Sequence, residues 1–258
     1  MTPFSRLDFT RYYDLLYSDK NYPAECDLVE DVFKSFASQR PATILDAGCG
    51  SGGHAIHLAQ RGYDIVGLDR SPSLLQIARK RSDEAGLRTQ FHEGDLRTFE
   101  LGRQFDACIS MFAVMGFQLK NSDVQQALRQ IRKHLTPGAI FLFDVWHGSA
   151  VLLHGVEKRL KLLEKDGLRL YRFATPTLDP MSHTNEVNQH LLVIDIENNK
   201  MLDEVVEPQL IRYFFPQEVI FHLEIAGFEV CKLFTFGKLD QDASAQDWEI
   251  GIVARACA

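Results

Sequence analysis

From residue 42 the chain alternates short apolar runs with amphipathic stretches, and this alternation restricts its fold more than any other feature. Apolar runs bounded by turn residues predict buried strands, and the stretches between them have the spacing of helices. Strands that alternate with helices form a parallel sheet with right-handed crossovers and helices on both faces. The pattern therefore predicts an α/β fold of the Rossmann-like, doubly wound type, with a mostly parallel seven-stranded sheet.

The expected strands of this sheet are seven apolar runs: 42–48, 63–69, 88–95, 105–112, 139–146, 228–236 and 247–256. Helices are expected between them, over 54–62, 71–86, 121–135 and 216–227. Residues 136–138 (Thr-Pro-Gly) are expected to stop the third helix before the fifth strand begins. The pattern changes after Trp146, where strand-like runs and turn signals over 156–214 predict an antiparallel β insertion.

A glycine-rich turn, Asp46-Ala47-Gly48-Cys49-Gly50-Ser51-Gly52, lies where the first expected strand meets the first helix. Ligands of open α/β sheets bind at the carboxyl ends of strands, and glycine lets them approach the backbone. Asp69 ends the second strand, where a carboxylate can accept hydrogen bonds from both ribose hydroxyls of an adenosine. Asp95 ends the third strand, where it can accept a bond from the adenine amino group.

Each of these motifs also has a purely structural explanation. The glycines could form a tight turn without a ligand, Asp69 could cap the next helix, and Asp95 could be a turn residue. Ser71 fits the capping role more naturally than Asp69 does. The coincidence of three such motifs at the ends of three successive strands favours an adenosine site over three separate structural roles.

Asp46 and the glycine spacing distinguish between the adenosine cofactors. The dinucleotide fingerprint is Gly-x-Gly-x-x-Gly with a pyrophosphate at the helix N-terminus, whereas here the glycines stand at alternate positions. The carboxylate of Asp46 would repel a pyrophosphate and attract the ammonium and sulfonium groups of S-adenosylmethionine (SAM). The sequence therefore favours SAM as cofactor, and an NAD(P)-dependent oxidoreductase is the less favoured alternative.

At these residues the chain resembles the class I SAM-dependent methyltransferases. Residues 45–52 match their first motif, 68–71 their ribose motif, 94–95 their adenine motif and 135–138 the turn before strand five. The resemblance implies that SAM is held by residues of these motifs and their neighbours: Tyr13, Tyr22, Asp46, Gly48, Gly50, Gly52, Asp69, Arg70, Leu74, Asp95, Leu96, Met111 and Phe112. It says nothing about the methyl acceptor.

The N-terminal arm carries a narrower resemblance. Tyr13-Asp14-x-x-Tyr17-x-x-Lys20-x-Tyr22, the β insertion and Arg212-Tyr213-Phe214 are similar to small-molecule N-methyltransferases that act on nucleotide-linked amino sugars. In that family the aromatic arm covers the methionine end of SAM, and the insertion helps to form the acceptor site and a dimer contact. This chain departs from the family at Met115-Gly116-Phe117-Gln118, where those enzymes tend to carry a histidine.

Three parts are expected from the pattern and the resemblance. Residues 1–146 would hold the aromatic arm and the SAM-binding core. Residues 147–215 would form the antiparallel insertion, with the acceptor site and a possible homodimer contact. Residues 216–258 would complete the core sheet.

The catalytic candidates are few, because the sulfonium of SAM is already reactive and the protein has mainly to position the acceptor. Tyr13 and Tyr17 are candidates because their hydroxyls could lie near the reaction centre, although an aromatic strap over the core would use only their rings. His147 and Asp144, after strand five, could supply a base. A hydroxyl acceptor would need such a base or a metal, whereas an amine needs only to be neutral.

Composition and charge exclude several other classes of function. The net charge is −7 with no block of lysine and arginine, so neither nucleic acid nor an anionic membrane is expected as a partner. Five scattered cysteines indicate neither a disulfide framework nor a zinc site, and His54 with His57 lacks a third metal ligand. With no apolar leader or membrane-length run, a cytoplasmic location is expected.

A non-catalytic SAM-binding partner subunit is the main alternative function.

Overall fold

The computed structural model describes residues 12–258, apart from the side chain of Asp14, as two compact units. The larger unit comprises Asn21–Leu153 and Arg212–Ala258, and the smaller one joins His154–Ile211 to the described residues up to Lys20. Each unit has hydrophobic core residues of its own. Residues 9–11, the beginning of the expected aromatic arm, lie outside the described residues.

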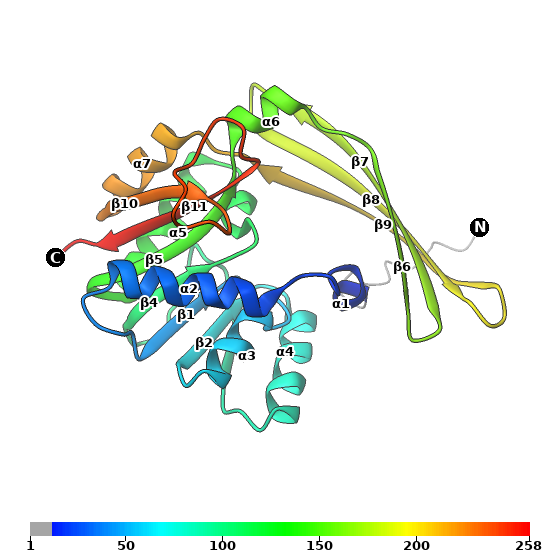
Figure 1. Ribbon diagram of the computed structural model, residues 1–258, viewed down its shortest axis with the longest axis horizontal. Coiled ribbons are helices and arrows are strands. Elements are labelled where there is room, and N and C mark those ends of the chain that lie inside the picture. Colours follow the sequence, from blue (N-terminus) through cyan, green and yellow to red (C-terminus); the bar gives the residue numbers. More distant parts are fainter. Residues whose placement is uncertain (1–11) are drawn as a thin grey trace. The chain divides into compact units, whose positions relative to one another are not determined.

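The larger unit is built on a seven-stranded sheet with the strand order β10-β11-β5-β4-β1-β2-β3 (Figure 1). Its strands are β1 (Thr43–Ala47), β2 (Asp64–Asp69), β3 (Gln90–Glu93), β4 (Phe105–Ser110), β5 (Leu135–Trp146), β10 (Phe228–Thr235) and β11 (Glu249–Ala256). The pairs from β3 to β5 are parallel, and β11 is antiparallel to both of its neighbours. The expected mostly parallel, Rossmann-like sheet is confirmed, and its order reverses between β1 and β4, where such sheets bind ligands.

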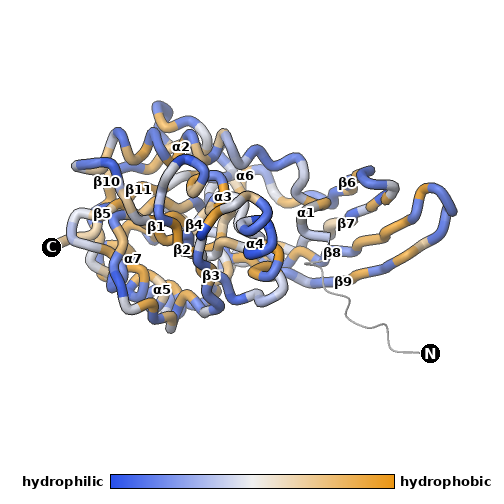
Figure 2. Tube along the Cα trace, turned by 90° about the horizontal axis from the view of Figure 1, so that it is seen from below, coloured by the Kyte–Doolittle hydropathy of each residue, from blue (hydrophilic) through white to orange (hydrophobic). Residues whose placement is uncertain are grey.

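Helices cover both faces of this sheet (Figure 1). One face carries α2 (Tyr22–Phe36), α3 (Gly53–Gln60) and α4 (Pro72–Glu84), and the other carries α5 (Asn121–Lys133) and α7 (Pro216–Ile225). The short helix α6 (Gly148–His154) follows β5. Because both faces are covered, the central strands are buried, and Figure 2 shows that their residues are mostly hydrophobic. No helix in the described part of the chain has the length and apolar character needed to cross a bilayer.

Strand β5 begins four residues earlier than expected, at Leu135 instead of residue 139. Its pairing with β4 changes register between Phe105↔Leu135 and Ala107↔Ile140, so the intervening residues of β5 bulge out of the ladder. Gly138 has a φ of +83°, which suits such a bulge. The expectation that residues 136–138 form a turn before the strand is therefore wrong, because they lie within it.

The smaller unit contains a four-stranded sheet with the order β6-β7-β8-β9 (Figure 1). Its strands are β6 (Arg159–Lys165), β7 (Leu168–Asp179), β8 (Thr184–Asp195) and β9 (Lys200–Arg212). Strand β7 is antiparallel to both β6 and β8. The expected antiparallel insertion after strand five is confirmed. The turns between β6 and β7 and between β8 and β9 contain Asp166 and Asn199, both with positive φ.

The helix α1 (Tyr13–Leu16) packs on one face of this smaller sheet. Tyr12 and Leu16 are buried among apolar residues of the sheet, and the Tyr12 hydroxyl donates to Asp203 at 2.9 Å. Lys161 Nζ donates to the Leu16 carbonyl at 3.1 Å and to Asp19 at 2.8 Å. The described part of the arm before α2 thus forms one compact unit with the β insertion.

Candidate functional site

The glycine-rich turn follows β1 at the carboxyl edge of the larger sheet. Gly48, Gly50 and Gly52 have φ values of +89°, +53° and +80°, in the left-handed region that glycine adopts without strain. A Cβ on Gly48 would lie 2.5 Å from Val114 Cγ1, so close packing also excludes a side chain there. The Gly48 N–H donates to the Leu68 carbonyl at 2.7 Å, which fastens the turn to the end of β2.

Asp46 lies in β1 just before this turn and is only 1% exposed. Its Oδ2 atom has no hydrogen-bond partner among the described residues. Burial, and secondly the charge of Asp69, raise the pKa of Asp46 to about 7. A nearby cation would stabilise the ionised form of such a buried carboxyl group. Asp46 therefore fits the positively charged methionine end of SAM.

Asp69 holds the glycine-rich turn from the end of β2. Its Oδ2 accepts from the Gly50 N–H at 2.9 Å, and its Oδ1 accepts from the Ser71 N–H at 2.8 Å. Each oxygen keeps a further lone pair that a ribose hydroxyl could use. The capping role belongs to Ser71, whose Oγ accepts from the Leu74 N–H at 3.3 Å at the start of α4.

Asp95 is engaged by its own neighbour, Arg97. The Arg97 guanidinium donates from Nε to Oδ1 at 2.9 Å and from Nη2 to Oδ2, and the Arg97 N–H adds a bond at 2.9 Å. The hydrogen bond from the Arg97 side chain lowers the pKa of Asp95. Oδ1 of Asp95 accepts two of these bonds and Oδ2 one, so Asp95 keeps fewer lone pairs for an adenine amino group than Asp69 keeps for a ribose. Leu96, the other candidate at this strand end, is buried beside it.

The candidate residues that follow β4 and β2 differ in how exposed their side chains are. Met111 is buried and belongs to the core beneath α2, α3 and α4. Phe112 is 37% exposed. Arg70 is also exposed, and its guanidinium lies 5.5 Å from the ring centroid of Phe117. Phe112 and Arg70 therefore remain accessible at the strand ends, whereas Met111 has the surroundings of a core residue.

The two candidate bases after β5 have different surroundings. Asp144 is fully buried, and its two oxygens accept from the Phe112 and Ala113 N–H groups, each at 2.6 Å. His147 is 4% exposed, and neither of its ring nitrogens has a hydrogen-bond partner among the described residues. Asp144 is thus committed to the backbone, while His147 keeps both nitrogens for another group.

The tyrosines of the arm belong to different units. Tyr13 and Tyr17 lie on and after α1 in the smaller unit, with ring centroids 4.7 Å apart, and burial raises the pKa of Tyr17. Tyr22 begins α2 in the larger unit, where a Cβ on Gly53 would lie 2.3 Å from its ring. Its ring also meets His54 edge-on. The structure therefore brings Tyr22 to the glycine-rich turn and pairs Tyr13 with Tyr17.

Some residues of this edge stand in none of the sequence motifs. Val114 packs on Gly48, and the Ser110 hydroxyl donates to the Ala47 carbonyl at 2.7 Å. Glu25 pairs with His54 at 2.6 Å, which gives that histidine a partner in α2. Ser110 is a polar break in an apolar strand and so leaves a trace in the sequence. The contacts of Val114 and Glu25 arise only when distant segments meet.

Comparison with known proteins identifies the domain that carries these motifs. Residues 44–138 match a family described as methyltransferase domain. The chain is 34% identical over 142 residues to dTDP-3-amino-3,4,6-trideoxy-alpha-D-glucopyranose N,N-dimethyltransferase of Streptomyces venezuelae. The aligned region covers 54% of this chain and 58% of that protein. The chain is equally identical, over 142 residues, to dTDP-3-amino-3,6-dideoxy-alpha-D-glucopyranose N,N-dimethyltransferase of Streptomyces fradiae, covering 54% and 53%. The matches span little more than half the length of these relatives.

Solved structures share the fold over nearly the whole chain. DesVI of Streptomyces venezuelae is 24% identical with a TM-score of 0.80, covering 98% of this chain and 99% of its own. A SAM-dependent methyltransferase of Clostridium acetobutylicum is 15% identical with a TM-score of 0.80, covering 96% and 97%. Residues 44–138 therefore match a methyltransferase domain, and the chain as a whole shares the Rossmann-like fold of these solved structures.

Proposed function

We propose that this chain transfers a methyl group from SAM to a nitrogen or oxygen of a small molecule, with a nucleotide-linked amino sugar as the first candidate. The observation that carries the proposal is the buried Asp46, whose Oδ2 has no partner among the described residues, at the start of a glycine-rich turn. The curated relatives named as dTDP-amino-sugar N,N-dimethyltransferases support the choice of acceptor.

The residues at the carboxyl edge have complementary chemistry for the parts of SAM. Asp46 would hold the charged methionine end, Asp69 the ribose, and the backbone at Leu96 the adenine. Phe112 would cover the methionine chain as an exposed apolar side chain. When bound, SAM supplies a methyl group that its sulfonium already activates.

The protein has then to position the acceptor and to accept one proton from it. An amine nitrogen gives up a proton after it is methylated, and a hydroxyl gives one up as it attacks. His147 is proposed to take this proton, because its buried ring has no hydrogen-bond partner among the described residues. Tyr13 and Tyr17 are proposed to orient the acceptor with their hydroxyls.

SAM and its product S-adenosylhomocysteine are expected to raise the melting temperature of the protein, whereas NAD at the same concentration is not. A ligand that binds only the folded state stabilises it by about 2.7 kcal/mol at ~100 times its dissociation constant. Scanning fluorimetry with the three compounds in parallel measures this. A melting temperature that responds to NAD and ignores SAM would sink the cofactor assignment.

Turnover with a panel of acceptors tests the rest of the proposal. Nucleotide-linked amino sugars should be methylated, and the matching hydroxyl sugars serve as controls for nitrogen against oxygen. The variants His147→Asn and Tyr17→Phe should lower kcat and leave S-adenosylhomocysteine affinity unchanged, because they act on the acceptor. Tyr13→Phe should also lower kcat. Wild-type rates in all three variants would remove these catalytic candidates.

Asp69→Ala is expected to weaken SAM binding by roughly tenfold or more, and Asp95→Ala by much less. The Asp69→Ala variant would lose the ribose bonds and also the bond that Asp69 accepts from the Gly50 N–H. Asp95 is occupied by Arg97 and has little left to offer the cofactor. Isothermal titration of both variants decides the order, and wild-type affinity in Asp69→Ala would refute its ribose role.

We also propose that the smaller sheet forms a homodimer contact through the face that α1 does not cover. Leu160 and Leu162 of β6 are 60% and 53% exposed, and their partners across the ladder are Phe173 and Tyr171 of β7. Exposed apolar side chains gathered on one sheet face favour association. Light scattering should find a dimer in the wild type and a monomer in Leu162→Glu; a monomeric wild type would contradict the proposal.

A further inference from the structure

The chain turns through two strained residues immediately after β4. Phe112 and Ala113 have φ values of +78° and +54°, although neither is glycine. Non-glycine residues enter this region at a cost in conformational free energy, and they persist there only where surrounding contacts fix them. Backbone strain of this kind is concentrated at functional sites. The contacts that hold this Phe112–Ala113 turn are therefore of functional interest.

The contact that fixes the turn is the carboxylate of Asp144. Its two oxygens accept separately from the Phe112 and Ala113 N–H groups, both at 2.6 Å. Asp144 lies in β5 next to the end of β4, since its neighbour Phe143 pairs with Ser110. Hydrogen bonds are stronger in a fully buried place than in water, so the two bonds to this one side chain can offset the strain of both residues.

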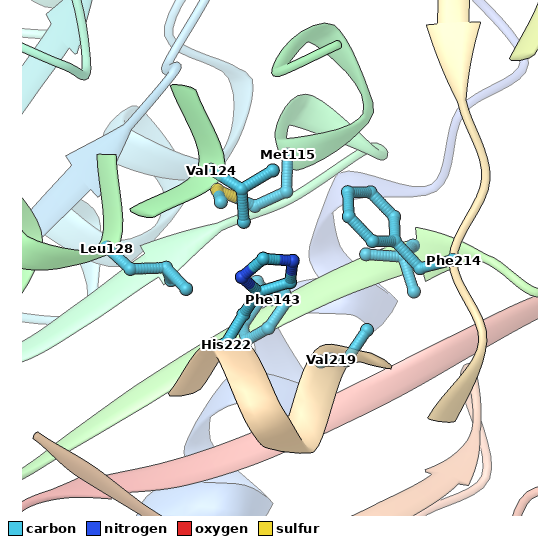
Figure 3. Close-up of a pocket in the computed structure, with 8 residues that line it drawn as sticks. Met115, Val124, Leu128, Phe143, Phe214, Val219 and His222 are labelled. Atoms are coloured by element: carbon cyan, nitrogen blue, oxygen red, sulfur yellow. The ribbon is translucent and has the colours of Figure 1, made fainter. Parts of the chain in front are cut away.

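Apolar residues surround the segment that follows the turn. The 3-10 helix η2 (Val114–Phe117) follows directly, and its Met115 lies over a small cavity of about 10 Å³ (Figure 3). Side chains of α5, β5 and α7 line the other sides of this cavity: Val124, Leu128, Phe143, Val145, Val219 and His222. Phe112 itself is partly exposed. The two bonds to Asp144 are thus the polar contacts that hold the backbone of Phe112 and Ala113.

The segment held in this way contacts two parts of the proposed SAM site. Val114 packs so closely on Gly48 that a Cβ there would lie 2.5 Å from it. Phe117 lies under the guanidinium of Arg70, which follows Asp69 in the chain. A change in the turn would thus reach both the glycine-rich turn after β1 and the end of β2.

Glu249 of β11 is the remaining group that acts on Asp144. Burial, and then the charge and hydrogen bond of Glu249, raise the pKa of Asp144. The two backbone bonds that Asp144 accepts, from the Phe112 and Ala113 N–H groups, do not involve Glu249. Glu249 is thus a neighbour that can be changed without removing the two backbone bonds.

We propose that Asp144 is a positioning residue that holds the Phe112–Ala113 turn, and through it the wall of the SAM site formed by residues 112–117. This inference rests on the proposed function, because it assigns the wall to that cofactor. It differs from a role as acceptor base, since both oxygens of Asp144 already accept backbone N–H groups in a fully buried place.

The test measures S-adenosylhomocysteine binding by titration calorimetry together with ligand-free melting temperature. Asp144→Asn leaves only one acceptor for two N–H groups, and we expect at least about a tenfold loss of affinity. Adding Ala113→Gly should restore at least about threefold of this loss, because glycine takes a φ of +54° without strain. Glu249→Gln is the matched control and should stay within about twofold of the wild type.

A merely structural role predicts a different result. In that case Asp144→Asn would melt earlier but bind with wild-type affinity, and Ala113→Gly would restore nothing; this outcome overturns the inference. If Asp144→Asn does not fold, Ala113→Val strains the same turn with Asp144 intact, and unchanged affinity there also overturns it. If the wild type binds no S-adenosylhomocysteine, the proposed function itself is refuted. This outcome is distinct from a failure of the inference, which shows only in the variants.

Discussion

Replacing Asp46 with asparagine is expected to abolish detectable SAM binding and to make the ligand-free protein more stable at neutral pH. The carboxyl group is buried, its Oδ2 has no partner among the described residues, and its pKa is raised to about 7. Asparagine keeps the shape and removes the cost of a buried charge. It also removes the negative charge that would attract the methionine end of SAM.

The sign of the stability effect follows from proton binding. Between the ordinary pKa of 3.8 and the folded value of about 7, folded Asp46 holds a proton that the unfolded chain has released. Its contribution to stability is therefore present at low pH and is lost as the pH rises through about 7. The gain in Asp46→Asn should grow over this window, to about 4 kcal/mol above pH 7.

Urea unfolding of wild type and variant at pH 5 and pH 8 measures this difference. Asp95→Asn is the matched control, because the Arg97 hydrogen bond lowers the pKa of Asp95 and its loss should not stabilise the protein. In the wild type, SAM affinity should rise from pH 6 to pH 8, since a bound cation favours ionised Asp46. A variant that is less stable than the wild type at pH 8 contradicts the burial argument.

Gly48→Ala is expected to destabilise the protein by about 2–4 kcal/mol and to remove most SAM affinity. A methyl group at a φ of +89° is strained, and it would also lie 2.5 Å from Val114 Cγ1. Gly62→Ala separates the two causes, because Gly62 has a φ of +88° with no atom within 4 Å of its added Cβ. It should cost only the backbone strain of about 1–2 kcal/mol.

The double variant Gly48→Ala, Val114→Ala completes this comparison. Shortening Val114 makes room for the new methyl group but leaves the backbone strain, so stability should return to near that of Gly62→Ala. Thermal unfolding of the wild type, the two single glycine variants and the double variant separates the cost of backbone strain from the cost of contact with Val114. Titration calorimetry measures the SAM affinity of the same proteins. Equal loss in Gly48→Ala and Gly62→Ala would show that contact with Val114 has no part in the effect.

The larger sheet could be predicted from sequence because its signals are local. Strands such as β1 and β2 are apolar runs that end at turn residues, and each ends within one residue of the expected position. Asp46 could be singled out because a carboxylate at a ligand-facing strand end restricts the cofactor. Asp95 shows the limit, since its bonds to Arg97 depend on the rotamer of a neighbouring side chain.

Long-range contacts are what the sequence could not reveal. The Tyr12–Asp203 bond joins residues 191 positions apart, and no local pattern connects the arm to the insertion. Asp144 could be located at a strand end, but its bonds to the Phe112–Ala113 turn require the register of β4 and β5. The bulge at Pro137 and Gly138 was hidden because the same residues are typical of turns.

The strand order has a consequence for folding while the chain is being synthesised on the ribosome. Strand β11 lies between β5 and β10 although it is synthesised after both. While residues 147–248 are being translated, roughly 5–20 s at ordinary rates, β5 has an open edge with unpaired backbone groups. A nascent chain stalled before β11 would therefore expose an apolar strand to edge-to-edge aggregation.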